Sequence, residues 1–215
     1  MDGFNLYHAI KELNWDPSTG KKLQKAHLRW LDLWALSKAI IHPSRDNLVS
    51  VYWFSAFADW IPSDSKIRHQ VYCRALRSTG VQTILGNFKK KPRKCPKCRH
   101  EWAAHEEKES DVNLAIQLVR LAFKDGFDKA IIFSADTDLA PAIKMVKETH
   151  PTKEVHVAIP ARRLQKTNAL VSAAHGKIKL RESHFANNLL PKHITTGDGN
   201  GIIRPEYYDP PTTLR

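Results

Sequence analysis

The alternation of short apolar segments with longer amphipathic ones constrains this chain more than any other feature. Five apolar segments predict buried strands, at 48–56, 81–85, 129–134, 154–159 and 177–180. Segments with apolar residues at helical spacing lie at 24–41, 65–79, 107–124, 139–149 and 161–174. Strands that alternate with helices over short connections predict an α/β fold, in which a central, mainly parallel sheet carries helices on both faces.

Length and composition narrow the class of protein. A chain of 215 residues predicts one domain, or one domain with an insertion. Its 42% hydrophobic and 26% charged residues are typical of a globular chain, and the three cysteines are too few for a disulfide framework. We find neither a signal-peptide pattern nor an apolar run of the roughly 18–20 residues that a membrane span needs. We therefore expect a soluble, cytoplasmic protein without a membrane partner, whose oligomeric state stays open.

The net charge of +12 is concentrated in two places. Residues 89–99 carry seven basic side chains and residues 155–181 carry six, and neither segment contains an acid. Two basic patches on a near-neutral body indicate a polyanionic partner such as RNA, although a solubility role is the simpler alternative. The residues that we expect to hold an RNA backbone are Lys89, Lys90, Lys91, Arg93, Lys94, Lys97, Arg99, Arg162, Arg163 and Lys166.

Four aspartates lie where a parallel sheet gathers its functional groups. Asp136 and Asp138 follow the strand 129–134, Asp111 begins the helix 107–124, and Asp2 precedes the first helix. Carboxylates held close together repel one another, and a hard cation such as Mg²⁺ relieves that repulsion through oxygen ligands. The alternatives are that Asp138 caps the next helix, that Asp136 is a turn residue, and that Asp111 is favoured by the helix dipole.

Three segments carry a resemblance to a known family. The residues at 2–7 (Asp-Gly-Phe-Asn-Leu-Tyr), at 107–113 and at 131–141 resemble, in the same order, the signature segments of the NYN domain, one of the PIN-like nuclease families. This resemblance implies a PIN-like three-layer α/β/α sandwich over residues 1–184, with a basic insertion at 88–106. We expect the remaining residues, 185–215, to form an irregular tail because glycine and proline are frequent there.

The resemblance also implies a ribonuclease that depends on Mg²⁺ or Mn²⁺. It maps the metal ligands onto Asp2, Asp111, Asp136 and Asp138, with Asn5 and Ser134 positioning water or phosphate. The residue types suit that chemistry, because a bound cation lowers the pKa of a water molecule and neutralises charge on the scissile phosphate. An Asp-x-Asp segment also occurs in haloacid-dehalogenase-type phosphotransferases, but there it would follow the first strand.

This chain departs from the family pattern in three ways. Gln117 stands where many members have a second acid, and Ala135 stands where glycine is usual. Members also begin with an apolar central strand, whereas this chain starts at Met1, directly before Asp2. We expect such a start if the chain is a fragment or if its start codon is misassigned. We therefore expect a sheet that lacks its first strand, with exposed strand edges and an unanchored Asp2. Gln117 and the missing first strand favour the alternative of an RNA-binding or interaction module with a weakened metal site.

The basic insertion carries a C-x-x-C motif. Cys95 and Cys98 have the spacing at which two thiolates meet one tetrahedral zinc ion, and His100 and His105 are candidates for the other two ligands. The alternative is a pair of reduced thiols in a flexible basic loop. Trp60 and Trp102 lie in polar or basic surroundings, where they would either stack on unpaired bases or be partly covered by a loop.

Overall fold

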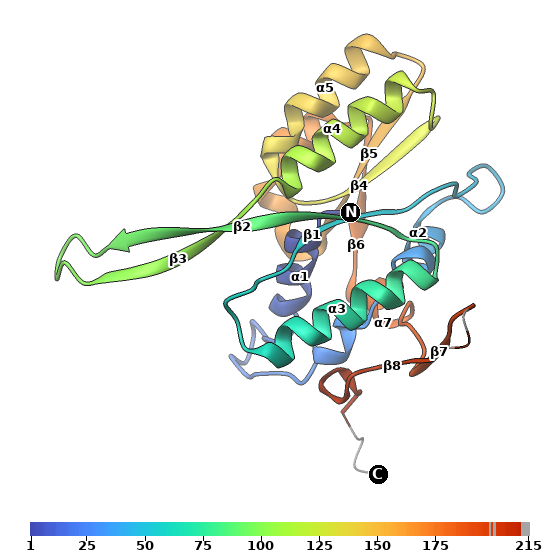
Figure 1. The fold of residues 1–215 in the computed structure, drawn as a ribbon. Helices are drawn as coiled ribbons and strands as arrows, with labels where there is room; N and C mark the ends of the chain where they lie inside the picture. The colour runs from blue at the N-terminus through green and yellow to red at the C-terminus, as the bar shows by residue number, and fades with distance from the viewer. Residues whose placement is uncertain (198, 200, 212–215) are drawn as a thin grey trace.

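The computed structural model describes residues 1–197, 199 and 201–211 (Figure 1). The α-helices are α1 (Gly3–Glu12), α2 (Leu33–Ile40), α3 (Ser63–Ser78), α4 (Ser110–Phe123), α5 (Ala140–Thr149), α6 (Asn168–Ala173) and α7 (Glu182–Ala186). The 3-10 helices are η1 (Ala26–Arg29), η2 (Thr137–Leu139), η3 (Ala161–Lys166) and η4 (Glu206–Tyr208). The strands are β1 (Tyr52–Ala56), β2 (Gln82–Lys94), β3 (Glu101–Lys108), β4 (Lys129–Phe133), β5 (Glu154–Pro160), β6 (Gly176–Leu180), β7 (His193–Thr195) and β8 (Gly201–Ile203).

The central sheet consists of two three-stranded parts that the first two residues join. One part has the order β1-β2-β3 and the other β4-β5-β6, and every pair except β2–β3 is parallel. Between them, the Asp2 N–H donates to the Phe133 carbonyl and the Phe54 N–H donates to the Met1 carbonyl, both at 3.0 Å. The mainly parallel α/β sheet predicted from the sequence is therefore confirmed.

Consecutive residues of each strand point to opposite helical layers. Trp53 and Phe133 pack in the cluster that contains the buried side chains of α1, α2, α3 and α7. Their neighbours Phe54 and Ile132 pack in the other cluster, with α4, α5 and α6. Helices thus cover both faces of the sheet (Figure 1), which explains why its strands read as continuous apolar runs rather than as alternating ones.

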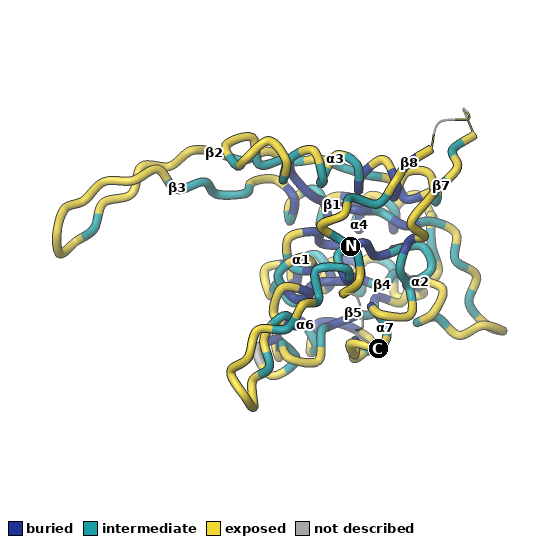
Figure 2. Tube along the Cα trace, turned by 90° about the horizontal axis from the view of Figure 1, so that it is seen from below, coloured by how far each residue is buried: buried dark blue, intermediate teal, exposed yellow. Residues whose placement is uncertain are grey.

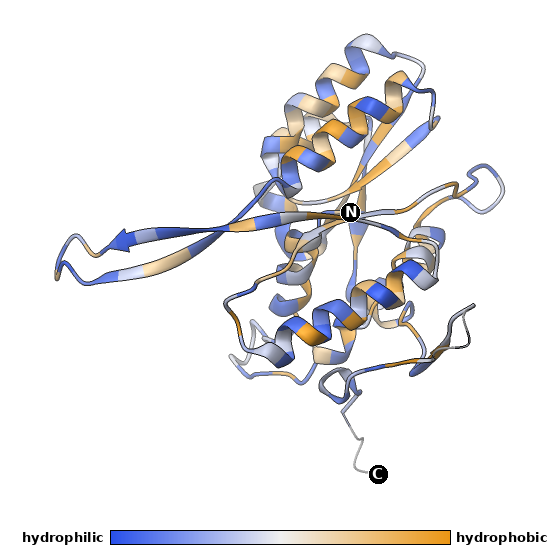
Figure 3. Cartoon of the chain, viewed as in Figure 1, coloured by the Kyte–Doolittle hydropathy of each residue, from blue (hydrophilic) through white to orange (hydrophobic). Residues whose placement is uncertain are grey.

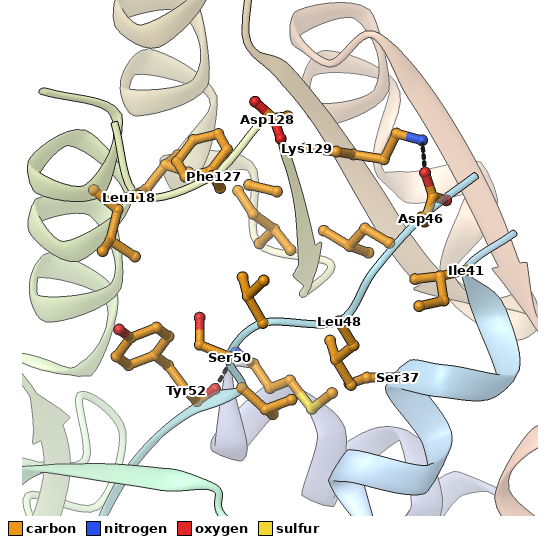
Figure 4. A pocket seen from close by; sticks show the side chains of 18 of the residues that line it. Ser37, Ile41, Asp46, Leu48, Ser50, Tyr52, Leu118, Phe127, Asp128 and Lys129 are labelled. Atoms are coloured by element: carbon orange, nitrogen blue, oxygen red, sulfur yellow. Dashed lines mark hydrogen bonds and ion pairs between the residues drawn. The ribbon is translucent and has the colours of Figure 1, made fainter. Parts of the chain in front are cut away.

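The expectation that Asp2 would lose its anchor is wrong. Its backbone pairs with β4, its side chain is 1% exposed, and the N-terminal ammonium group of Met1 donates to the Tyr52 carbonyl at 2.7 Å. Burial lowers the pKa of that ammonium group to about 5. Beyond Met1, however, the segment leading into β1 separates from β4 and leaves a space of about 440 Å³, into which Leu48, Leu118 and Phe127 face (Figure 4).

The basic insertion forms an antiparallel hairpin, so the prediction of a loop at 88–106 is wrong. Residues 87–94 pair with 101–108, and a turn at 95–100 joins them. We call residues 87–108 the arm; it projects from the body and is exposed along most of its length (Figure 2). Arg93 and Glu106 form an ion pair across it at 2.8 Å. Because both faces of the arm meet solvent, its strands lack the apolar pattern by which strands are recognised.

Three further segments differ from the sequence predictions. The expected helix at 24–41 is split into η1 and α2, because Asp32 caps α2 by accepting from the backbone of Trp34 and Ala35 at 2.9 and 3.0 Å. The expected helix at 161–174 is similarly split into η3 and α6. The described part of the tail is not wholly irregular: it forms β7, β8 and η4, and Trp30 donates through Nε1 to the Pro191 carbonyl, whereas residues 198, 200 and 212–215 lie outside the described part. No helix in the described ranges is long and apolar enough to cross a membrane.

Candidate acidic site

Asp2 is held at the carboxyl end of the sheet by three donors. As the cap of α1, its Oδ1 accepts from the Asn5 backbone N–H at 2.9 Å. Its Oδ2 accepts from the Asn5 side-chain amide at 2.6 Å and from the Ser134 hydroxyl at 2.7 Å. Asn5 and Ser134 were predicted to line the site, and in the structure both fix the orientation of this buried carboxylate.

Ser134 also connects Asp2 to the turn that carries Asp136. Its hydroxyl accepts from the Asp136 backbone N–H at 3.0 Å, directly after β4 ends. Asp136 in turn caps η2 by accepting from the Asp138 backbone N–H at 2.9 Å. The alternative in which Asp138 caps the next helix is therefore wrong, since α5 has no side-chain cap. Asp136 both caps a turn and faces the cavity described next.

Three of the four predicted carboxylates line a single open cavity of about 770 Å³. They are Asp2, Asp111 and Asp136, whereas Asp138 lies beside this lining. The rest of the wall is rich in aromatic side chains, which sequence reasoning did not bring together: Phe4, Tyr7, Trp53, Trp60, Tyr72, Phe88 and Tyr208. The cavity therefore places an acidic end next to a wall that suits a planar ring.

Negative charges gather at the acidic end of the cavity. Burial, and then the negative charges of Asp2, Asp136, Glu107 and Asp138, raise the pKa of Asp111 to about 7. The neighbouring Ser110 hydroxyl also lines the cavity, and it is buried without a hydrogen-bond partner in the described part of the chain. Glu107 and Ser110 are residues that the sequence analysis missed as site residues, although both flank Asp111 in the Glu-Lys-Glu-Ser-Asp segment.

The donor chemistry of the site fits a hard divalent cation. Its ligands would all be oxygen atoms, and a cation would neutralise the negative charges that, after burial, raise the pKa of Asp111. Across the described residues, no three His, Cys, Asp or Glu side chains are already arranged around one point. Asp111 and Asp136 would therefore have to close on the ion as it binds beside the fixed carboxylate of Asp2.

Without metal, the contribution of Asp111 to stability should fall as the pH rises from 3.8 to about 7. In this range the folded state keeps a proton on Asp111 that the unfolded chain has lost, so deprotonation disfavours folding. Asp111→Asn removes this titration and should gain stability relative to the native protein as the pH rises. Urea unfolding in chelator at several pH values measures the difference; a difference that stays constant across the range would contradict the electrostatic account.

Gln117 and Ala135 are the two departures from the family pattern that fall within the motifs. Gln117 is 9% exposed and faces the 440 Å³ space at the other end of the sheet, where its Oε1 accepts from Arg120 at 3.3 Å. It therefore does not line the acidic cavity. Ala135 does not have a left-handed backbone, so the exchange for the usual glycine introduces no strain of that kind.

Arg162 and Arg163 both bind residues of α1. Arg162 donates to the backbone carbonyls of Glu12 and Trp15 at 2.6 and 2.8 Å, so it closes the end of the helix. Arg163 pairs with Glu12 at 2.5 Å and donates to the side-chain oxygen of Asn5 at 2.9 Å. Arg163 thus orients Asn5, which in turn orients Asp2. The side chain of Lys166, the third residue predicted here, lies outside the part that the structure describes.

The basic side chains of the arm are exposed, but some are paired. Lys91 and Arg93 both contact Glu106, and Lys94 contacts Glu101 at 2.8 Å. The other predicted contacts with RNA on the arm are exposed as well: Lys89, Lys90, Lys97 and Arg99. The arm therefore offers positive charge at defined positions along a strand ladder.

Only three of the four predicted zinc ligands belong to the same turn. Cys95, Cys98 and His100 belong to the turn at the tip of the arm, whereas His105 pairs with Lys90 farther along the ladder. The His105 ring stacks on Trp60, with centroids 3.8 Å apart, at the wall of the acidic cavity. His105 thus belongs with the cavity, and Trp60 remains 42% exposed there.

A family model for the NYN domain matches residues 1–181. The chain belongs to the NYN domain family. Among curated proteins, this NYN protein is 32% identical over 256 aligned positions to the 6-hydroxy-3-succinoylpyridine 3-monooxygenase HspA of Pseudomonas putida (strain DSM 28022 / S16), covering all of this chain and 76% of that protein. It also matches a solved structure of a protein of unknown function from Vibrio parahaemolyticus RIMD 2210633, with a TM-score of 0.42 and 18% identity, covering 77% of this chain and 82% of the other.

Proposed function

We propose that this NYN protein is a metal-dependent ribonuclease that hydrolyses RNA phosphodiester bonds. The observation that carries the proposal is the meeting of Asp2, Asp111 and Asp136 at one open cavity, where burial and then the neighbouring negative charges raise the pKa of Asp111. An NYN domain implies a nuclease-type fold, and the basic arm beside the cavity supports a polyanionic substrate. Without a bound cation, the negative charge of the cavity would repel that substrate.

In this proposal Asp2, Asp111 and Asp136 hold Mg²⁺ or Mn²⁺, with Asp138 alongside. The bound ion would lower the pKa of a water molecule and neutralise charge on the phosphate. The chain's own contribution is preorganisation: Asn5 and Ser134 fix the Asp2 carboxylate, and Arg163 fixes Asn5. Such fixed orientation reduces the rearrangement that catalysis requires.

The substrate would extend from the cavity along the arm. Phe88 and residues 105–108 line the cavity, and the exposed Lys89, Lys90 and Lys97 lie farther toward the tip. The stacked pair of Trp60 and His105 stands where the arm meets the cavity, so it offers an aromatic surface to an unpaired base. Phosphate contacts along the arm would position the strand without reading its sequence.

The decisive experiment measures cleavage of single-stranded and structured RNA with Mg²⁺, Mn²⁺ or a chelator. We expect cleavage with either metal and none in chelator, with activity restored when the metal is added back. Single-stranded DNA of the same sequence is the matched substrate control. Cleavage that persists in chelator would contradict the metal role. Metal-independent RNA affinity without any cleavage would instead favour the RNA-binding module with a weakened site.

A second candidate, a monooxygenase acting on a small N-heteroaromatic ring, is favoured by two observations. The relative from Pseudomonas putida carries the name of such an enzyme, and the cavity of this chain has a wall of aromatic side chains. The reaction would place one oxygen atom of O₂ on the ring and reduce the other to water, with two electrons and two protons from a reductant. Oxygen uptake with 6-hydroxy-3-succinoylpyridine and NADH, compared with NADH alone, separates this candidate from the nuclease. Uptake that does not depend on the ring compound would reject it.

A further inference from the structure

The turn at the tip of the arm has the geometry of a metal-binding knuckle. The Cys95 N–H donates to the His100 carbonyl at 2.8 Å and the Arg99 N–H donates to the Cys95 carbonyl at 2.9 Å, which closes the turn. Arg99, the residue after the second cysteine, has a left-handed backbone with φ of 58°, which is uncommon for a residue with a side chain. The side chains of Cys95 and Cys98 are hydrogen-bonded to each other, so the two sulfur atoms lie on the same side of the turn.

Within the turn, backbone amides point at one of the two sulfur atoms. The N–H groups of Cys98 and Lys97 donate to the Cys95 sulfur. Hydrogen bonds of this kind also stabilise the negative charge of a sulfur atom that binds a metal ion. Cys98 is exposed and Cys95 is partly exposed, so both sulfur atoms are accessible.

Two thiolates provide half of a tetrahedral zinc site, and the described part of the chain does not supply the other half. No group of three or more His, Cys, Asp or Glu side chains suited to a metal ion occurs among the described residues. His105 is stacked on Trp60, and Cys73 is buried in α3. A closed structural zinc site, which takes four protein ligands, therefore needs ligands from another molecule.

A second copy of this chain fits that need. The arm carries the turn away from the body, so two tips can meet without contact between the bodies (Figure 2). A ladder of eight residue pairs spans roughly 25 Å, since strands rise about 3.3 Å per residue. A two-fold axis through the ion would bring the same two cysteines from each copy, which is the closed symmetry that most homodimers use.

The charge of the tip supports the same arrangement. Four thiolates around one Zn²⁺ carry net negative charge, and each tip adds Lys97 and Arg99, which would offset it. Without metal, the same basic side chains would make two tips repel each other. We propose that Cys95 and Cys98 from two copies hold one zinc ion, and that this zinc ion joins two molecules through the tips of their arms.

Metal content and molecular mass, measured together, test this proposal. Purified full-length protein with added zinc and a thiol reductant should contain one zinc ion per two chains and have the mass of a dimer by light scattering. A chelator should give zinc-free monomers, and zinc should restore the dimer. In the variant with Cys95→Ser and Cys98→Ser, both zinc and dimer should be lost, while the melting temperature in chelator should equal that of the native protein in chelator, because the tip is exposed.

Two matched variants complete the test. Cys73→Ala removes the remaining cysteine and should keep both the zinc and the dimer. His100→Ala should also keep both, because all four proposed ligands are thiolates. One zinc ion per monomer, a dimer that survives the double cysteine variant, or loss of zinc with His100→Ala would each overturn the proposal. None of these readouts depends on RNA cleavage, so the proposal stands or falls independently of the proposed function.

Discussion

Asp136→Asn is expected to reduce RNA cleavage on the order of 1000-fold while leaving the fold intact. The exchange removes one negative oxygen from the acidic end of the cavity, so the affinity for metal and the stabilisation of the reacting phosphate both fall. The asparagine side chain keeps an oxygen atom that accepts from the Asp138 N–H, so the cap of η2 should survive. Single-turnover cleavage with saturating Mg²⁺ measures the loss, and thermal unfolding checks the fold.

Asp128→Asn is the matched control for this variant. Asp128 is exposed and lies at the other end of β4, outside the acidic cavity, so its exchange should leave the cleavage rate unchanged. It removes the same charge from the protein, which separates a local effect at the cavity from a general effect on the net charge. Cleavage by the Asp136 variant at the native rate would refute the site, and an equal loss in both variants would point to charge alone.

Gly3→Ala is expected to destabilise the protein by about 3 kcal/mol, which lowers the melting temperature by roughly 10 °C for a chain of this size. A methyl group at this position would lie 2.5 Å from the Phe54 carbonyl oxygen and 2.7 Å from Cζ2 of Trp53. The carbonyl belongs to β1 and the ring is buried, so neither can move without disturbing the sheet. Thermal or urea unfolding measures the loss.

The same exchange at a site with open space provides the control. Gly197 is exposed and has no atom within 4 Å of the position that a methyl group would take, so Gly197→Ala should leave stability unchanged. If Gly3→Ala is equally harmless, the close approach of α1 to β1 does not require glycine. Cleavage should fall with Gly3→Ala even below its melting temperature, because Asp2 precedes this glycine and any shift of the turn misplaces its carboxylate.

The buried strands and the acidic motif could be predicted because their patterns are local. The segments 129–134 and 154–159 contain apolar residues whether or not their partners are known, and β4 and β5 form there. Asp136 follows its strand directly, so its place at the carboxyl edge follows from the topology of a parallel sheet. The arm could not be predicted in the same way, since its strands are stabilised by cross-strand pairs such as Arg93 with Glu106 rather than by burial.

The sequence by itself determined the α/β class, the family and the residues of the acidic motif, because hydrophobic periodicity and short motifs are written in consecutive positions. Only the tertiary structure decided how those residues work together. Ser134 reaches Asp2 across 132 positions, Arg163 reaches Asn5 across 158, and Trp60 stacks on His105. Contacts of this kind depend on how elements distant in the sequence pack, and local patterns do not encode that packing. His105 and Cys95 likewise lie close together in the sequence, but the tertiary structure places them at different ends of the arm.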